Sequence, residues 1–270
     1  MIGTTQEVQL KFFIPSMNQF KKPSIIVPAR LASTRFPRKL LHEINGKPLI
    51  IITAERLVSI GSEFDLFFAV DGREIGEVLN DSGYQTILTD PALPSGTDRI
   101  AEANKILQHE KIINVQADEP MVSRSHLCQL VEALDKQGAS MSTLAVPFDK
   151  REDFLDPNQV KVILDENDYA LYFSRSPIPY DRTGLNDWEN FKNFACPKKH
   201  IGMYGYRSEF LQKFSSNKVG NLEKVESLEQ LRALEMGARI AVSGVNEVSI
   251  GIDCPEDFIK FTDIYLKSNQ

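Results

Sequence analysis

The chain has 270 residues, of which 42% are hydrophobic and 25% charged, so it can bury a substantial core. Its net charge of −6 disfavours nucleic acid as a partner, because an acidic surface repels the phosphate backbone. No stretch approaches 18 uninterrupted apolar residues, so we expect no membrane-spanning helix and no membrane partner. The three cysteines lack metal-ligand spacing and fit free thiols in a reducing compartment, which predicts a cytoplasmic protein.

The first part of the chain alternates between short β-branched runs and helical segments. Residues 1–22 carry no signal-peptide pattern, and we expect them to form a disordered leader. The strands are expected at 24–28, 66–70, 85–88, 112–115 and 141–146, and the helices at about 48–60, 73–81, 98–109 and 123–136. This alternation predicts parallel β-α-β units, and therefore a Rossmann-like α/β fold with a mixed, mainly parallel sheet flanked by helices.

The pattern changes after residue 150. Residues 160–164 and 169–173 flank a turn and predict a hairpin, while 180–199 form a polar, aromatic excursion. A strand is expected at 203–206, an amphipathic helix at 222–236 and a closing helix at 255–266. We predict a single domain over 23–270, divided into a core (about 23–150), a smaller second lobe (about 151–250) and a closing segment (251–270).

Three polar loops leave the carboxyl ends of the predicted strands, at 29–39, 89–97 and 116–120. Ligands of parallel α/β sheets bind at this edge, so the chemistry is expected there. The first loop carries four cations: Arg30, Arg35, Arg38 and Lys39. Such a concentration favours phosphate binding over a solvated basic loop. The sequence contains neither a Walker A loop nor a G-x-G-x-x-G fingerprint, so side chains and loop amides would have to hold the phosphates.

Two further sites in the sequence supply carboxylates. Asp118 and Glu119 follow the predicted strand 112–115, and Asp253 precedes the closing helix. Mg²⁺ typically takes one or two carboxylates together with substrate phosphates and water. From position alone, Asp253 is more typical of a helix cap than of a metal ligand.

The segment Ile-Val-Pro-Ala-Arg-x-x-Ser-Thr-Arg-x-Pro-x-Lys, residues 26–39, resembles the CTP-binding loop of the 3-deoxy-manno-octulosonate (Kdo) cytidylyltransferases, which are relatives of the CMP-sialate synthetases. Six further segments resemble the family in the same order: 95–99, 114–120, 171–175, 200–207, 228–232 and 251–257. The resemblance extends from about residue 24 to the end of the chain.

The resemblance implies roles for individual residues. The implied CTP contacts are Pro28, Ala29, Arg30, Lys39, Ser95, Gly96, Thr97, Arg99 and Gln116. The implied catalytic residues are Arg30, Arg35, Lys39 and Asp118, and the implied ligands of Mg²⁺ are Asp118 and Asp253. The implied sugar-binding residues are Arg175, His200, Tyr204, Glu229 and Gln230. Without the resemblance, His200 would be a structural hydrogen-bonding residue and Glu229 and Gln230 an exposed helix face.

The resemblance also implies the reaction, in which CMP is transferred from CTP to Kdo and pyrophosphate is released. The product, CMP-Kdo, would serve lipopolysaccharide synthesis. The resemblance further implies a homodimer formed through the second lobe. Arg38, Leu40 and Ala117 stand where Kdo enzymes usually have glycine, proline and glycine. These departures leave open a related acidic sugar, of the 8-amino-Kdo or sialate type. Two other classes are a glycosyltransferase, whose usual Asp-x-Asp is absent from this chain, and a nucleotide-binding module without activity.

Overall fold

The computed structural model describes residues 22–33, 35–183, 185–246 and 251–268. The predicted leader lies almost wholly outside these ranges, so its disorder stays a prediction. In the part of the chain that is described, no helix combines the length and the apolar character needed to cross a lipid bilayer.

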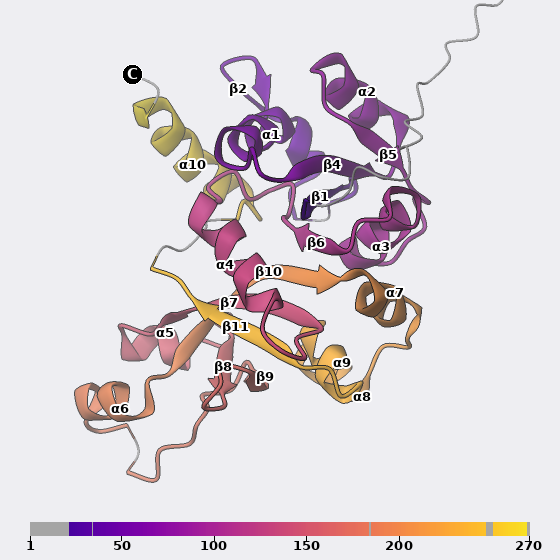
Figure 1. The fold of residues 1–270 in the computed structure, drawn as a ribbon. Coiled ribbons are helices and arrows are strands. Elements are labelled where there is room, and N and C mark those ends of the chain that lie inside the picture. Colours follow the sequence, from indigo (N-terminus) through magenta and orange to yellow (C-terminus); the bar gives the residue numbers. More distant parts are fainter. Residues whose placement is uncertain (1–21, 34, 184, 247–250, 269–270) are drawn as a thin grey trace, which may run out of the picture.

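One mixed sheet connects the two parts of the described chain (Figure 1). Its main path runs through β11 (Ile240–Gly244), β7 (Met141–Pro147), β10 (Lys198–Arg207), β6 (Lys111–Asn114), β1 (Ser24–Ala29), β4 (Asp65–Val70) and β5 (Thr86–Leu88). Strands β6, β1, β4 and β5 are parallel, as are β11 and β7. Among the described strands of this path, only β10 is antiparallel to its neighbours, β6 and β7. The predicted Rossmann-like, mainly parallel sheet is confirmed.

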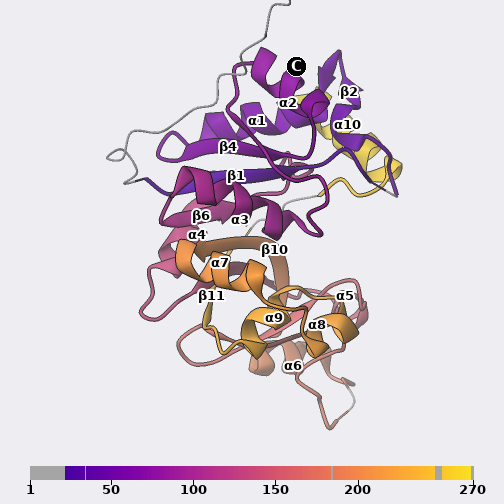
Figure 2. The same ribbon diagram turned by 90° about the vertical axis from the view of Figure 1, so that its right-hand side faces the viewer.

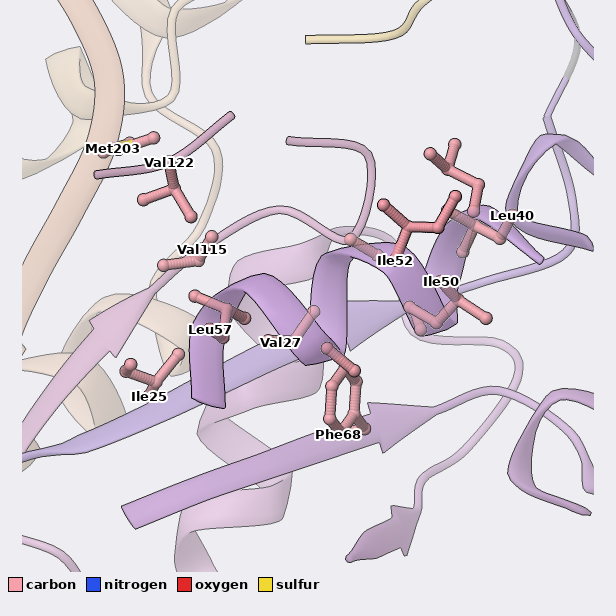
Figure 3. Close-up of a cluster of buried hydrophobic side chains, with 14 of the residues drawn as sticks. Ile25, Val27, Leu40, Ile50, Ile52, Leu57, Phe68, Val115, Val122 and Met203 are labelled. Atoms are coloured by element: carbon pink, nitrogen blue, oxygen red, sulfur yellow. The ribbon is translucent and has the colours of Figure 1, made fainter. Parts of the chain in front are cut away.

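Both faces of the central strands are buried, which explains their continuous apolar sequence. In β1, Ile25 and Val27 belong to one hydrophobic cluster and Ile26 to the other, as the two-residue period of a strand requires. The first cluster lies under α1 (Leu49–Ile60), α2 (Arg73–Asp81), α4 (Arg124–Leu134) and α10 (Pro255–Ser268). Figure 3 shows part of it, with Leu57 of α1 above Val27 and Phe68. The second cluster lies under α3 (Gly96–Leu107), α7 (Ser208–Ser216) and α9 (Gln230–Glu235).

The second lobe is built on β10. The hairpin predicted for residues 160–173 is formed by β8 (Lys161–Leu164) and β9 (Ala170–Ser174). Its strand β8 pairs with the start of β10. Helices α5 (Arg151–Leu155) and α6 (Trp188–Ala195) lie at the end of the molecule remote from α1 and α2 (Figure 2). Their aromatic side chains pack together, with the rings of Phe154 and Trp188 5.5 Å apart. The excursion predicted over 180–199 therefore contains a helix.

The predicted helix over 222–236 is wrong. The segment forms two short helices, α8 (Asn221–Glu226) and α9, separated by Ser227 in the left-handed conformation with φ 51°. The chain folds back because Arg232 of α9 donates two 2.7 Å hydrogen bonds to Glu223 of α8. As a result, Val225 is 84% exposed, and only the later part of the predicted apolar stripe, Leu228 and Leu231, is buried.

Several other elements differ from the sequence-based expectation. Strand β10 is longer than the predicted 203–206, and its polar first half was not expected. Helix α7 and strand β11 were also not expected. After the cationic loop, a short 3₁₀ helix (Lys39–Leu41) leads into the small hairpin β2 (Glu43–Ile44) and β3 (Lys47–Pro48).

The crowding around β10 gives a test of this packing. A Cβ atom at Gly205 would lie 2.4 Å from Ser142 Oγ, whose hydroxyl donates a 2.7 Å hydrogen bond to the Leu130 carbonyl. Gly205→Ala should therefore lower the free energy of unfolding by about 1–3 kcal/mol, measured by urea denaturation. The matched control is Gly202→Ala in the same strand, where a Cβ would meet no atom within 4 Å. Equal stabilities of the two variants would contradict the proposed crowding.

Candidate active site

Three loops meet at the carboxyl edge of the parallel strands, as predicted. They follow β1, β5 and β6, and Gly96, at the start of α3, lies at their junction. A Cβ atom at Gly96 would be 3.2 Å from the Pro28 ring and 3.6 Å from Gln116 Oε1. The absence of a side chain at Gly96 is what allows the three loops to approach this closely.

A cavity of about 530 Å³ opens at this junction. Nine of the residues implied for the nucleotide, catalysis or the metal line it: Pro28, Arg30, Arg35, Lys39, Gly96, Arg99, Gln116, Asp118 and Asp253. Among these are four cations and two carboxylates. A polar, cationic cavity of this size suits a charged ligand with several phosphates.

Lys39 connects the two carboxylates. Its ammonium contacts Asp118 directly, lies 3.6 Å from Asp253 Oδ1 and donates a 2.8 Å hydrogen bond to the carbonyl of Ile252. The Lys39 side chain is only 13% exposed, and that of Asp118 23%. Arg35 forms a second ion pair with Asp253, at 2.9 Å. The structure therefore brings these four charged residues into one cluster.

The segment that carries Asp253 is docked on the loop after β6. The Ile252 amide donates a 2.9 Å hydrogen bond to the carbonyl of Asp118. Asp257, in the first turn of α10, also holds this segment, because its carboxylate accepts from the amides of Asp253 and Cys254. The Asp253 carboxylate is thus directed to Lys39 and Arg35, an arrangement that a simple helix cap does not require.

Arg38 differs from the other three cations of the loop. It is in the left-handed conformation, with φ 56°, and its guanidinium pairs with Glu74 of α2. Arg38 is not among the residues that line the cavity. The expectation that all four cations of the loop face one ligand is therefore corrected to three: Arg30, Arg35 and Lys39.

Sequence reasoning missed Asp71, which follows β4. Its carboxylate accepts a 3.2 Å hydrogen bond from the amide of Leu31, and its own amide donates to the carbonyl of Ala29. Asp71 therefore holds the cationic loop where it leaves β1. A polar residue directly after a buried strand was the available signal, but the sequence does not show which loop it contacts.

The other implied CTP contacts lie in or beside the wall of the cavity. Ala29 is a buried residue of β1, and Ser95 caps α3 by accepting a hydrogen bond from the Asp98 amide. Arg99 is nearly buried and donates a 2.6 Å hydrogen bond to Thr89 Oγ1. Burial lowers the pKa of Arg99, while nearby Asp71 acts in the opposite direction. Even a lowered arginine pKa leaves the guanidinium charged at neutral pH.

Four of the five implied sugar-binding residues form a second cluster. The rings of His200 and Tyr204 lie 5.5 Å apart, and the Tyr204 hydroxyl donates a 3.1 Å hydrogen bond to Gln230 Oε1. Burial lowers the pKa of His200 to about 3, so the imidazole is neutral at physiological pH. Glu229 connects this cluster to the cavity, because Thr97 Oγ1 donates a 2.6 Å hydrogen bond to Glu229 Oε2.

Arg175 lies elsewhere. Its guanidinium donates to the backbone carbonyls of Pro157, Glu226 and Ser227, with a shortest distance of 2.6 Å to Glu226. These bonds fasten the end of β9 to the end of α8. The structure does not show Arg175 contacting the cluster of His200 and Tyr204.

The donor set of the cavity fits a hard divalent cation. Within the described residues, no group of three or more His, Cys, Asp or Glu side chains could hold a metal alone. However, Asp118 and Asp253 meet at one ammonium, so their carboxylates can approach the same cation. Mg²⁺ completes its octahedron with water and substrate phosphates, and two carboxylates suffice for it.

The fold and the cavity define an α/β protein with a polar cavity at the carboxyl edge of its parallel strands, where four cationic side chains lie beside two carboxylates. Residues 24–240 match the family described as cytidylyltransferase. The chain belongs to this cytidylyltransferase family.

Individual relatives cover almost the whole chain. A 3-deoxy-manno-octulosonate cytidylyltransferase of Thermodesulfovibrio yellowstonii is 43% identical, over 86% of this chain and 93% of the relative. An 8-amino-3,8-dideoxy-manno-octulosonate cytidylyltransferase of Shewanella putrefaciens is 39% identical, over 87% of this chain and 95% of the relative. A structure of CMP:2-keto-3-deoxy-manno-octonic acid synthetase complexed with CTP matches with a TM-score of 0.83 and 32% identity, over 92% of this chain and 99% of the other. These matches confirm the family resemblance seen in the sequence motifs.

The link through Glu229 gives a prediction about pH. Burial raises the pKa of the Glu229 carboxyl, although the bond from Thr97 and the charge of Arg232 oppose this. Because the folded state then binds the proton more tightly than the unfolded state, stability is lost as the pH rises above the unfolded value of about 4.5. Relative to the wild type, Glu229→Gln should gain stability as the pH is raised from about 4.5 to neutrality, measured by urea unfolding. A constant difference over this range would show that Glu229 ionisation does not affect folding.

Proposed function

We propose that the chain transfers CMP from CTP to the anomeric hydroxyl of 3-deoxy-manno-octulosonate and releases pyrophosphate. The observation that carries this proposal is the cluster in which Lys39, from the cationic loop, meets Asp118 and Asp253 in a cavity also lined by Arg30 and Arg99. The family membership and the printed names of the relatives support it.

The reaction is an in-line attack of the sugar hydroxyl on the α-phosphate of CTP. Its charge develops on phosphoryl oxygens, so the task of the protein is positioning and electrostatic stabilisation. Arg30, Arg35 and Lys39 can serve this role because they line the cavity, and Gly96 would let the backbone approach the base. His200 is neutral and buried, which suits it to orient neighbouring side chains of the sugar site and not to act as an acid or a base.

Asp118 and Asp253 would hold Mg²⁺ together with the triphosphate. When bound, the ion would neutralise phosphate charge and lower the pKa of the attacking hydroxyl. In the ligand-free chain, Lys39 and Arg35 provide the positive charge that balances these two carboxylates. As the loop rearranges on the triphosphate, these cations can pair with phosphate oxygens.

A homodimer, a cytoplasmic location and a role in lipopolysaccharide synthesis belong to the same proposal. The second lobe offers apolar surface for a dimer, since Tyr180 and Phe194 are 84% and 91% exposed. Exposed aromatic side chains are enriched at protein interfaces, which favours this lobe as the place of contact.

The deciding experiment is pyrophosphate release from CTP with a panel of acidic sugars: Kdo, 8-amino-Kdo and a sialate, each with and without Mg²⁺. We expect turnover with Kdo that is lost when EDTA removes the metal and regained when Mg²⁺ is added back. Preference for 8-amino-Kdo, the substrate named for the Shewanella relative, would change the sugar but not the reaction. CTP binding with no turnover on any sugar would contradict the proposed function.

Lys39 and Arg38 form a matched pair for testing the cavity. They are adjacent in sequence, but only Lys39 lines the cavity, whereas Arg38 pairs with Glu74 on the surface. Lys39→Ala should reduce kcat about 10²–10³-fold, the size expected for loss of one donor to the transition state. Arg38→Ala should stay within about threefold of the wild type, because an exposed ion pair contributes little. Equal losses in steady-state kinetics would contradict the assignment of Lys39.

A further inference from the structure

Strand β10 contains an irregularity between the two aromatic residues of the sugar-binding cluster. Along its antiparallel pairing with β7, Ile201 lies opposite Leu144 and Tyr204 opposite Thr143, so two residues of β10 are inserted between adjacent positions of β7. In a regular ladder, position 204 would lie opposite Met141. The bulge therefore draws Tyr204 two positions closer to His200, which brings their rings to 5.5 Å.

The side chain of Thr143 holds this bulge. Its Oγ1 lies 2.8 Å from the Met203 carbonyl oxygen, 3.1 Å from the Ile201 carbonyl oxygen and 2.9 Å from His200 Nε2. Thr143 is fully buried. A hydroxyl in such a place costs stability unless it is hydrogen-bonded, and a valine of the same shape would avoid that cost. The three contacts explain why a hydroxyl can reside there.

These distances determine which atoms donate. Thr143 Oγ1 has one proton and three neighbours, and carbonyl oxygens can only accept. Its proton must therefore point to a carbonyl, since otherwise two unshielded oxygens would face each other at 2.8 Å. The contact to His200 can then form only if Nε2 carries a proton and donates it to Oγ1.

The direction of donation continues through the cluster. A neutral imidazole protonated at Nε2 has a bare Nδ1, and burial keeps the pKa of His200 low enough for the ring to be neutral. That Nδ1 accepts from the amide nitrogen of Gln230, at 3.5 Å. The amide is thereby oriented with Oε1 toward Tyr204, whose hydroxyl donates to it at 3.1 Å.

We propose that Thr143 is a positioning residue of the sugar site: its hydroxyl holds the β10 bulge and directs the hydrogen-bond chain from Tyr204 through Gln230 to His200. Because the proton of Tyr204 is committed to Gln230, the phenolic oxygen can only accept from a ligand. The site is thus set to receive a hydroxyl donor from a polyol. The part of this inference that concerns the sugar rests on the proposed function, whereas the protonation of His200 does not.

The first test examines the wild-type chain and uses one variant for assignment only. Nitrogen-15 NMR of the imidazole rings distinguishes a protonated from a bare ring nitrogen, and the chain has only four histidines, so His200 is assigned from the spectrum of His200→Gln. At neutral pH we expect His200 to be a single tautomer with its proton on Nε2. A proton on Nδ1, or a charged ring, would overturn the proposal.

The second test compares Thr143→Val with Thr143→Ser. Valine keeps the shape and removes the hydroxyl, so it should mix the His200 tautomers and raise KM for the acidic sugar about 3- to 10-fold, the factor for one hydrogen bond, with KM for CTP unchanged. Serine restores the hydroxyl and should return both properties to near wild type. The matched control is Ser142→Ala, which removes a buried hydroxyl from the adjacent position on the opposite face, where it donates to Leu130. This control should leave the tautomer and both KM values unchanged.

Other results would overturn the inference. An unchanged KM for the sugar in Thr143→Val would do so, as would equal rises for sugar and CTP, because a general loss of structure predicts the latter. If Thr143→Val does not fold, Thr143→Ser decides the matter. If Thr143→Ser then does not keep the proton of His200 on Nε2, the inference is contradicted. If no acidic sugar reacts with CTP at all, the proposed function fails, while the His200 tautomer still decides whether Thr143 directs the chain.

Discussion

Lys39 joins three segments that are far apart in the sequence. Its ammonium contacts Asp118, 79 residues away, and the carbonyl of Ile252, 213 residues away, and it lies close to Asp253. Because Lys39 is mostly shielded from water, these interactions are stronger than those of an exposed ion pair. Loss of Lys39 would leave the partly buried carboxylate of Asp118 without this compensating charge. The convergence of the loops after β1 and β6 and the segment before α10 therefore depends on this balance of charge.

The topology of the sheet is what makes such a convergence possible. Strands β1 and β6 are parallel neighbours, so their carboxyl ends lie at the same edge. The chain comes back to this edge before α10, where the amide of Ile252 bonds to the carbonyl of Asp118 and α10 packs its Phe261 into the cluster under α1. Apolar packing thus holds α10 in place, and the docked backbone presents Asp253 to the cations.

The parts of the fold that follow a local period could be predicted from the sequence. Helix α2 spans Arg73–Asp81, the same residues as expected, and α4, capped by Ser123, lies within the expected range 123–136. The helix over 222–236 was wrong because an apolar residue at every third position fits one long helix and two short ones equally well. The choice is made by the left-handed Ser227 and by the contact between Arg232 and Glu223, which are tertiary effects.

The candidate site, too, could be predicted from the sequence only in part. The motifs indicated the cationic loop and the carboxylates, and the structure brings most of them into one cavity. The sequence could not distinguish Arg38 from Lys39, because their difference comes from a left-handed residue and the position of Glu74. Thr143 was missed for a related reason. It lies in a strand where a β-branched residue is typical, and its function follows from a bulge in a different strand.

The two clusters differ in charge, and this difference can orient the proposed sugar. Around His200, Tyr204 and Gln230 the side chains are neutral, while the negative charge of Glu229 is already met by Thr97 and Arg232. Two cations that line the cavity, Arg30 and Arg35, lie on the other side, although Arg35 is paired with Asp253 in the ligand-free chain. In a 2-keto sugar acid the carboxylate is attached to the carbon that becomes anomeric. A sugar that directs its carboxylate to the cations and its hydroxyls to the neutral cluster therefore brings the anomeric hydroxyl to the triphosphate, so the same separation of charge that binds the substrate also places its reacting atom.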